Sequence, residues 1–232
     1  PDRQNPHRKP RDGGCICRFR LYRRSKGVKR GNMAHPKITK VEGRGIPLAG
    51  HDIDTDRIVP ARFLKAITFD GFENHLFCDE RERQPNHPLD EPKYKGGKIL
   101  FVGRNFGSGS SREHAPQAIL RFGIKAIVGV SFAEIFTGNC LAIGLPIVTA
   151  SSEVHDLLMR QIQEHPNIVY TVDLKKLKLS STEVAYDIQI SEERKNAFLN
   201  GTWNSLAILS ANNDEVRRTA DALPYISGFQ KA

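Results

Sequence analysis

Two short runs of branched apolar residues, with a helical pattern between them, constrain this chain more than any other feature. The runs are KILFVG at residues 98–103 and GIKAIVGV at residues 123–130, and both are typical of buried strands. Between them, apolar side chains at i, i+3, i+4 and i+7 from Ala115 mark one face of a helix. Pro116 is tolerated only in a first turn, so this helix should begin close to Arg112. The pattern predicts a βαβ unit with parallel strands and a right-handed crossover.

The rest of the chain adds further strands and helices to this unit. The patterns predict strands at 38–48, 146–148, 168–174 and 184–190, and helices at 70–77, 152–162, 192–199 and 214–223. Ser131 and Glu134 have the spacing of a capping box for another helix, and Ser152 is the expected cap of the helix that follows. Residues 79–97 are charged and rich in proline, which predicts an exposed loop. The expected fold class is α/β.

The net charge of +9 lies entirely in residues 1–32, which hold eleven Lys and Arg against two Asp and Glu. The remaining residues hold 24 of each sign and are neutral. We interpret 1–32 as a disordered basic leader, either non-native or upstream of a start near Met33. We expect a single domain over 33–232. A neutral body gives no basic face for nucleic acid, and no apolar run is long enough to cross a membrane, so neither is an expected partner.

The cysteines indicate a reducing compartment. Cys15, Cys17, Cys78 and Cys140 form neither a C-x-x-C motif nor a zinc-binding spacing. The expected location is the cytoplasm, or a plastid if the leader is a transit peptide. An iron–sulfur cluster usually takes three or four thiolates, so this chain should bind no metal and no cluster by itself.

The segment NFGSGSSREH, which joins the first strand of the βαβ unit to its helix, is the candidate binding site. Ligands of parallel sheets bind beyond the carboxyl ends of the strands. Gly107 and Gly109 permit positive φ and close backbone approach, and Ser110 and Ser111 are expected at the N-cap. Arg112 adds a planar guanidinium suited to a carboxylate or phosphate. Neither a Walker P-loop nor a hydrolase elbow matches, and a turn that merely caps a helix remains the alternative.

NFGSGSSREHAPQAI, with GHDIDTDRIVP upstream and SFAEIF downstream, resembles the small-subunit family of the 3-isopropylmalate dehydratases. This family is the swivelling domain of the aconitase superfamily, and the resemblance runs from Lys37 to about Leu223. It implies a three-layer β/β/α domain and a hydro-lyase of leucine biosynthesis. The reaction interconverts 2-isopropylmalate and 3-isopropylmalate through 2-isopropylmaleate. The resemblance also implies a heterodimer, active only with a large subunit that carries the [4Fe–4S] cluster.

The resemblance assigns roles to the Ser-Ser-Arg triplet. Ser110, the first serine, would act as an alkoxide base that takes a proton from the carbon next to a carboxylate. Ser111 and Arg112 would hold a carboxylate of the dicarboxylate substrate, with Gly109 beside them.

In the family, the Asp-Thr-Asp loop lies beside the active site. Thr55 and Asp56 are therefore candidate substrate-binding residues, although the same residue types equally suit an exposed turn.

Other functions remain open from the sequence alone. A related dehydratase acting on homoaconitate, citramalate or citraconate, or dimethylmalate shares the same motifs. A regulatory module that binds carboxylates, or an RNA-binding protein that uses the leader, belongs to a different class.

Overall fold

The structure is a computed structural model. It describes residues 36–226 apart from 67, 111, 182–183, 206–207 and 210–211. The predicted leader, the proposed start at Met33 and the predicted substrate residue Ser111 therefore lie outside the described residues.

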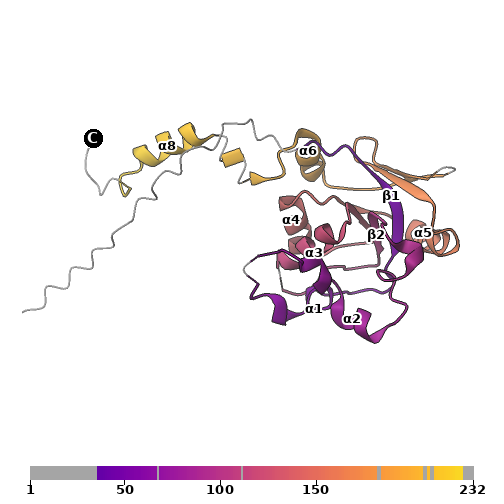
Figure 1. The fold of residues 1–232 in the computed structure, drawn as a ribbon. Helices are drawn as coiled ribbons and strands as arrows, with labels where there is room; N and C mark the ends of the chain where they lie inside the picture. The colour runs from indigo at the N-terminus through magenta and orange to yellow at the C-terminus, as the bar shows by residue number, and fades with distance from the viewer. Residues whose placement is uncertain are drawn as a thin grey trace, which may run out of the picture. The chain divides into compact units, whose positions relative to one another are not determined.

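The described residues form a mixed sheet with parallel and antiparallel halves (Figure 1). Its strands are β1 (Lys40–Pro47), β2 (Ile99–Val102), β3 (Ala126–Gly129), β4 (Ile147–Thr149), β5 (Val169–Asp173), β6 (Lys178–Ser180) and β7 (Ala185–Asp187). Their order across the sheet is β4-β3-β2-β1-β5-β6-β7. Strands β4, β3, β2 and β1 run parallel, and the pairs β1–β5, β5–β6 and β6–β7 are antiparallel. The α/β class is confirmed.

Strand β1 belongs to both halves of the sheet. Its first residues pair with β5, from Lys40 opposite Asp173, whereas Gly45 and the two residues after it pair with β2. A Cβ atom on Gly45 would lie 2.9 Å from both Ile162 Cδ1 and Phe101 Cε2. Glycine thus lets α5 (Ser152–Glu164), which carries Ile162, approach the strand closely at the change of partner.

The two ends of the sheet meet. Thr149 in β4 and Gln189, just after β7, donate their backbone N–H groups to each other's carbonyl oxygens, both at 2.8 Å. Because β4 and β7 are the opposite edges of the sheet, this bridge closes the sheet on itself.

Helices connect the parallel strands as predicted. Helix α3 (His114–Phe122) links β2 to β3, and α4 (Glu134–Ala142) links β3 to β4. All residues of β2 and β3 are buried. Further α-helices of the described residues are α1 (Thr55–Ile58), α2 (Cys78–Arg83), α6 (Glu192–Asn200) and α8 (Asn213–Ala222). The predicted βαβ unit and both C-terminal helices are confirmed.

Helix α3 begins close to Arg112 as predicted, but the predicted caps of three helices are wrong. Helix α3 begins at His114, after Glu113, so Ser110 lies outside its N-cap. Helix α4 has Ala133 at its N-cap and no side-chain cap, and the hydroxyl of Ser131, two residues earlier, accepts the backbone N–H of Asn105 at 2.9 Å. Helix α5 is capped by Ser151, one residue before the predicted position, whose Oγ accepts the N–H of Val154 at 3.3 Å.

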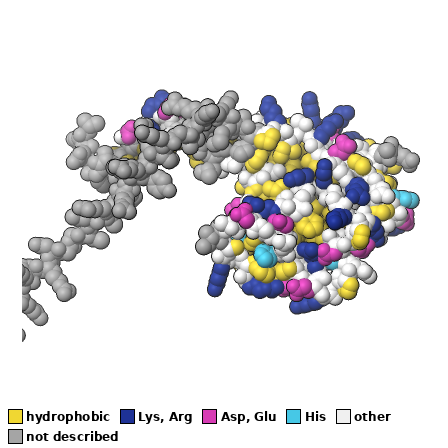
Figure 2. All heavy atoms as spheres, viewed as in Figure 1, with side chains coloured by type: hydrophobic (Ala, Val, Ile, Leu, Met, Phe, Trp, Pro, Cys, Tyr) yellow, Lys and Arg dark blue, Asp and Glu magenta, His cyan; other side chains and the backbone are white. Residues whose placement is uncertain are grey.

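The predicted exposed loop at 79–97 is also wrong in part. Most of α2 and a 3-10 helix at Pro92–Tyr94 lie within it, and His87, Leu89 and Tyr94 are buried. An ion pair between Arg81 and Asp90 closes the segment, with 2.8 Å between Nε and Oδ2. The charges predicted as a solvated loop therefore hold a small folded lobe together. Elsewhere on the face drawn in Figure 2, side chains of both signs are interspersed.

The turn between β5 and β6 depends on a buried carboxylate. Asp173 Oδ1 accepts the backbone N–H groups of Lys175 at 3.0 Å and Lys176 at 2.9 Å, and Lys40 Nζ lies 3.2 Å from Oδ2. Burial acts to raise the pKa of Asp173, but these donors and the ammonium outweigh it, so the pKa lies below its usual value.

We expect Asp173→Ala to lower the free energy of unfolding at pH 7 by about 2 kcal/mol, because two backbone donors lose their acceptor. Because the pKa of Asp173 is lower in the folded chain than in the unfolded chain, its ionised carboxylate stabilises the fold at pH values above the unfolded pKa of about 3.9. This stabilisation is lost as the pH falls through the pKa of Asp173 in the folded chain. Urea titrations at pH 7 and at acid pH measure both effects. A difference from wild type that persists unchanged in acid would contradict the assignment.

Candidate active site

The loops that leave β1 and β2 at their carboxyl ends are hydrogen-bonded to each other. The Gly107 N–H donates to the Ile53 carbonyl at 2.8 Å, and the Thr55 N–H donates to the Ser108 carbonyl at 2.9 Å. Asp54 and Ser108 form a parallel bridge between the loops. The Asp-Thr-Asp and Ser-Ser-Arg motifs, about fifty residues apart in the sequence, are thereby brought to one edge of the sheet.

Thr55 lies beneath the loop that carries Ser110. Its side chain is 3% exposed, and its Oγ1 donates to the Ser110 carbonyl at 2.9 Å. Asp54 holds the start of α1 in place by accepting the Arg57 N–H at 2.7 Å. Ser110 itself is exposed. The contact of Thr55 thus positions Ser110, and its role as a substrate contact stays a prediction.

Arg112 and Asp56 form an ion pair across the two loops. Arg112 Nη1 lies 3.1 Å from Asp56 Oδ1, and the side chains are 25% and 54% exposed. An exposed pair of this kind contributes little to stability, about 0–1 kcal/mol. It does hold the guanidinium against the Asp-Thr-Asp loop, with further N–H donors that an incoming carboxylate can use.

Two glycines give the loop its shape. Gly107 and Gly109 have φ values of 78° and 90°, as predicted from the motif. A Cβ atom on Gly107 would lie 2.2 Å from Cγ of Phe136, so the loop also packs against α4. At Gly109, the nearest atoms to such a Cβ are 3.6 Å away, so there is room for a side chain. Glycine is needed at this position because of its positive φ.

A second set of hydrogen bonds, which the sequence did not predict, supports the start of the loop. Asn105, with φ of 51°, donates its N–H to Ser131 Oγ at 2.9 Å and its Nδ2 to Asp52 Oδ1 at 2.8 Å. Asp52, with φ of 54°, donates its N–H to the Arg104 carbonyl at 2.9 Å. Asn and Asp are the side chains best tolerated at positive φ, which is the signal that the sequence offered.

Two histidines near these loops, His51 and His114, have structural contacts. His51 Nδ1 accepts the backbone N–H of Arg104 at 3.0 Å. The His114 ring packs against Phe69 and Phe72, with centroid distances of 5.2 and 5.6 Å. His51 therefore supports the loop after β2, and His114 packs against aromatic side chains.

The described residues do not fit an iron–sulfur cluster. They contain the cysteines Cys78 and Cys140, and they include no group of three or more His, Cys, Asp or Glu side chains placed to hold a metal ion. Burial raises the pKa of both thiols, and the Asp79 carboxylate raises that of Cys78 further, which disfavours the thiolate that iron requires. Within the described part of the chain, no helix is long and apolar enough to cross a membrane.

The two loops lie together at the carboxyl edge of the sheet, as the resemblance to the aconitase-type swivelling domain implies. Residues 35–152 match the family model of the aconitase C-terminal domain. The 3-isopropylmalate dehydratase small subunit of Synechocystis sp. is 45% identical over 191 residues, which cover 82% of this chain and 96% of that protein. The corresponding subunit of Thermus thermophilus is 46% identical over 193 residues with the same coverage.

Solved structures agree with these relatives. The crystal structure of a 3-isopropylmalate dehydratase from Methanocaldococcus jannaschii superposes with a TM-score of 0.58 at 25% identity, covering 78% of this chain and 99% of that chain. The chain belongs to the family of 3-isopropylmalate dehydratase small subunits. A small subunit works with a large one in a lyase, so the predicted fold, family and type of partner are confirmed.

The Thr55 contact predicts the effect of two substitutions. Thr55→Val keeps the shape of the side chain but removes the donor to the Ser110 carbonyl, and we expect it to cost about 1 kcal/mol of unfolding free energy. Thr55→Ser keeps the hydroxyl, so its free energy of unfolding should lie close to that of the wild-type chain. Urea unfolding of the full chain measures both, and equal stabilities for the two variants would contradict the contact.

Proposed function

We propose that this chain supplies the catalytic base and part of the carboxylate site of a two-subunit 3-isopropylmalate dehydratase of leucine biosynthesis. The observation that carries the proposal is an exposed Ser110 on a loop that the Thr55 contact and the Arg112–Asp56 pair both join to the Asp-Thr-Asp loop. The names of the relatives support the choice of isopropylmalate as substrate. In this reaction, 2-isopropylmalate and 3-isopropylmalate interconvert through 2-isopropylmaleate.

Ser110 acts as the base in this proposal. Its alkoxide oxygen takes the proton from the carbon next to a substrate carboxylate, and returns a proton when water adds back in the other orientation. A serine hydroxyl needs strong stabilisation of its anion for this task, at about 1.4 kcal/mol for each unit by which the pKa falls. The N-terminus of a helix supplies only about 0.3–1 kcal/mol. The larger part must come from the Arg112 guanidinium and the amides of the glycine loop.

Arg112 holds a substrate carboxylate by charge-assisted hydrogen bonds, with Ser111 and the Gly109 backbone beside it. Asp56 keeps the guanidinium in place before substrate arrives, and the carboxylate then takes up the donors that Asp56 leaves free. A planar guanidinium binds a carboxylate through two parallel hydrogen bonds, which fixes the orientation of the carbon that faces Ser110.

The large subunit completes the site. We propose that it carries the [4Fe–4S] cluster, which supplies the Lewis acid for the hydroxyl group that leaves. The exposure of Ser110 and of Asp56 fits a half-site that a partner covers. The unpaired thiols of the described residues favour a cytoplasmic location for the complex.

Ser110→Ala should abolish turnover in the enzyme reconstituted anaerobically with its large subunit, with a loss of at least about a thousandfold in kcat. The measurement is the absorbance of 2-isopropylmaleate, with subunit association followed separately by gel filtration. The matched control is Ser180→Ala in β6, away from the loop, which should keep wild-type turnover. If Ser110→Ala assembles and turns over like the control, Ser110 is not the base.

Arg112→Lys keeps the positive charge but loses the planar fork, so we expect KM to rise by roughly tenfold or more. Steady-state kinetics of the reconstituted enzyme measure this change. An unchanged KM would show that Arg112 does not bind the substrate carboxylate.

A further inference from the structure

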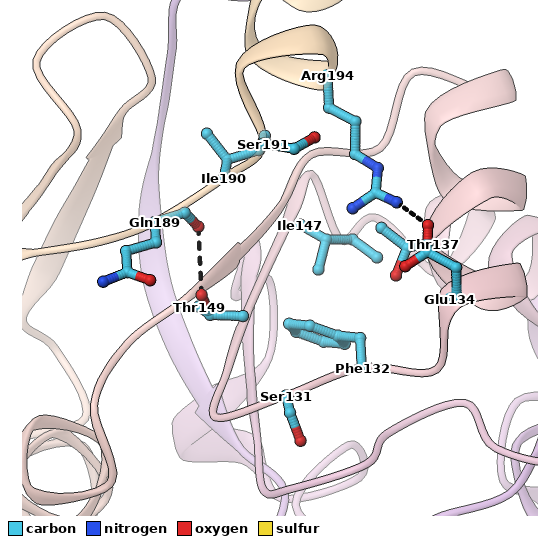
Figure 3. Close-up of a pocket in the computed structure, with 10 residues that line it drawn as sticks. All are labelled: Ser131, Phe132, Glu134, Thr137, Ile147, Thr149, Gln189, Ile190, Ser191 and Arg194. Carbon is cyan, nitrogen blue, oxygen red and sulfur yellow. Dashed lines mark hydrogen bonds and ion pairs between the residues drawn. The ribbon is translucent and has the colours of Figure 1, made fainter.

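A hollow of about 440 Å3 opens at the carboxyl ends of β3 and β4, between the beginnings of α4 and α6 (Figure 3). Its size falls within the range of about 300–1,000 Å3 that is usual for small-molecule sites. It lies beside the Ser110 loop but is separate from it, because none of the residues that line it belongs to the Ser-Ser-Arg or Asp-Thr-Asp motif. Its chemistry therefore requires its own explanation.

One side of the hollow is apolar. Phe132, Ile147 and Ile190 line it (Figure 3). Ile147 is 6% exposed, so a ligand on this wall would touch the edge of the core. An apolar wall of this size suits a small branched aliphatic group.

The charged lining of the hollow consists of one cation and one anion. Arg194, at the start of α6, forms an ion pair with Glu134, the first residue of α4. The Arg194 side chain is 25% exposed and that of Glu134 is 84% exposed, so the arginine lies deeper. Arg194 donates to Glu134 Oε1 through Nη2, and its guanidinium has further N–H donors next to the apolar wall.

We propose that this hollow binds a zwitterionic α-amino acid with a small, branched, apolar side chain. The carboxylate of such a ligand pairs with Arg194, its ammonium group pairs with Glu134, and its side chain packs on Phe132, Ile147 and Ile190. The two charges of an α-amino acid are attached to one carbon, which matches two opposite protein charges already in contact.

The same pair selects against other ligands. A simple carboxylate meets the negative charge of Glu134 when it approaches Arg194, and a simple amine meets the positive charge of Arg194. A dicarboxylate brings two negative charges against Glu134 and is disfavoured further.

The hollow is also lined by a residue whose side chain supports the catalytic loop. Ser131 lines it, and the Ser131 hydroxyl accepts the Asn105 N–H at 2.9 Å. A ligand in the hollow thus contacts a residue that fixes the start of the loop carrying Ser110.

Isothermal titration calorimetry on the full chain tests the proposal with four probes: L-leucine, L-valine, 3-methylbutanoate and 3-methylbutylamine. The two amino acids should bind, and the carboxylate and amine that lack one charge should bind at least roughly tenfold more weakly. Glu134→Gln and Arg194→Gln should each weaken L-leucine binding to a similar degree. The matched controls, Arg160→Gln and Glu164→Gln on the exposed face of α5, should bind like wild type.

Absence of binding by both amino acids to the wild-type chain would overturn the proposal, as would equal affinity for L-leucine and 3-methylbutanoate. Because the probe series uses the wild-type chain, it decides the question even if a variant fails to fold. L-leucine binding that both Gln variants retain in full would also overturn it, because the ligand would then occupy another surface.

Discussion

The hydrogen bonds between the loops after β1 and β2 are the constraint on which the site depends. Parallel neighbours deliver their carboxyl ends to the same edge of a sheet, and here both chains continue side by side past that edge. The Gly107 and Thr55 N–H groups cross-link the loops, and Thr55 Oγ1 reaches the carbonyl of Ser110. These contacts position the exposed serine before any ligand or partner is present.

This arrangement explains how the described residues, which include no metal-binding cluster, contribute to the proposed catalysis. Preorganised donors and bases lower a barrier because they need no rearrangement during the reaction. The sheet that closes on itself through Thr149 and Gln189 provides the rigid frame, and Gly45 allows α5 to pack against β1 behind it. The hollow beside Arg194 uses the same edge of the sheet, two strands further on, for a ligand of different charge.

The sequence predicted the features that depend on local pattern. The βαβ unit follows from apolar runs and helix spacing, and the motif residues around Ser110 follow from family resemblance. What it did not predict depends on contacts between distant segments. Ser131 has capping spacing, but its hydroxyl binds Asn105, and the charged segment 79–97 folds because its residues pair and bury one another. The motif likewise gave Thr55 as a site residue without revealing that it lies beneath the loop.

Amide hydrogen exchange on the free chain, resolved residue by residue, tests the central claim most directly. If the two loops are joined before the large subunit binds, the Thr55 and Gly107 amides should exchange at least about a hundredfold more slowly than in an unstructured peptide. Exchange of both amides at the unstructured rate, with the amides of β2 and β3 still protected, would show that the partner forms the loop. The site would then not be preorganised in this chain.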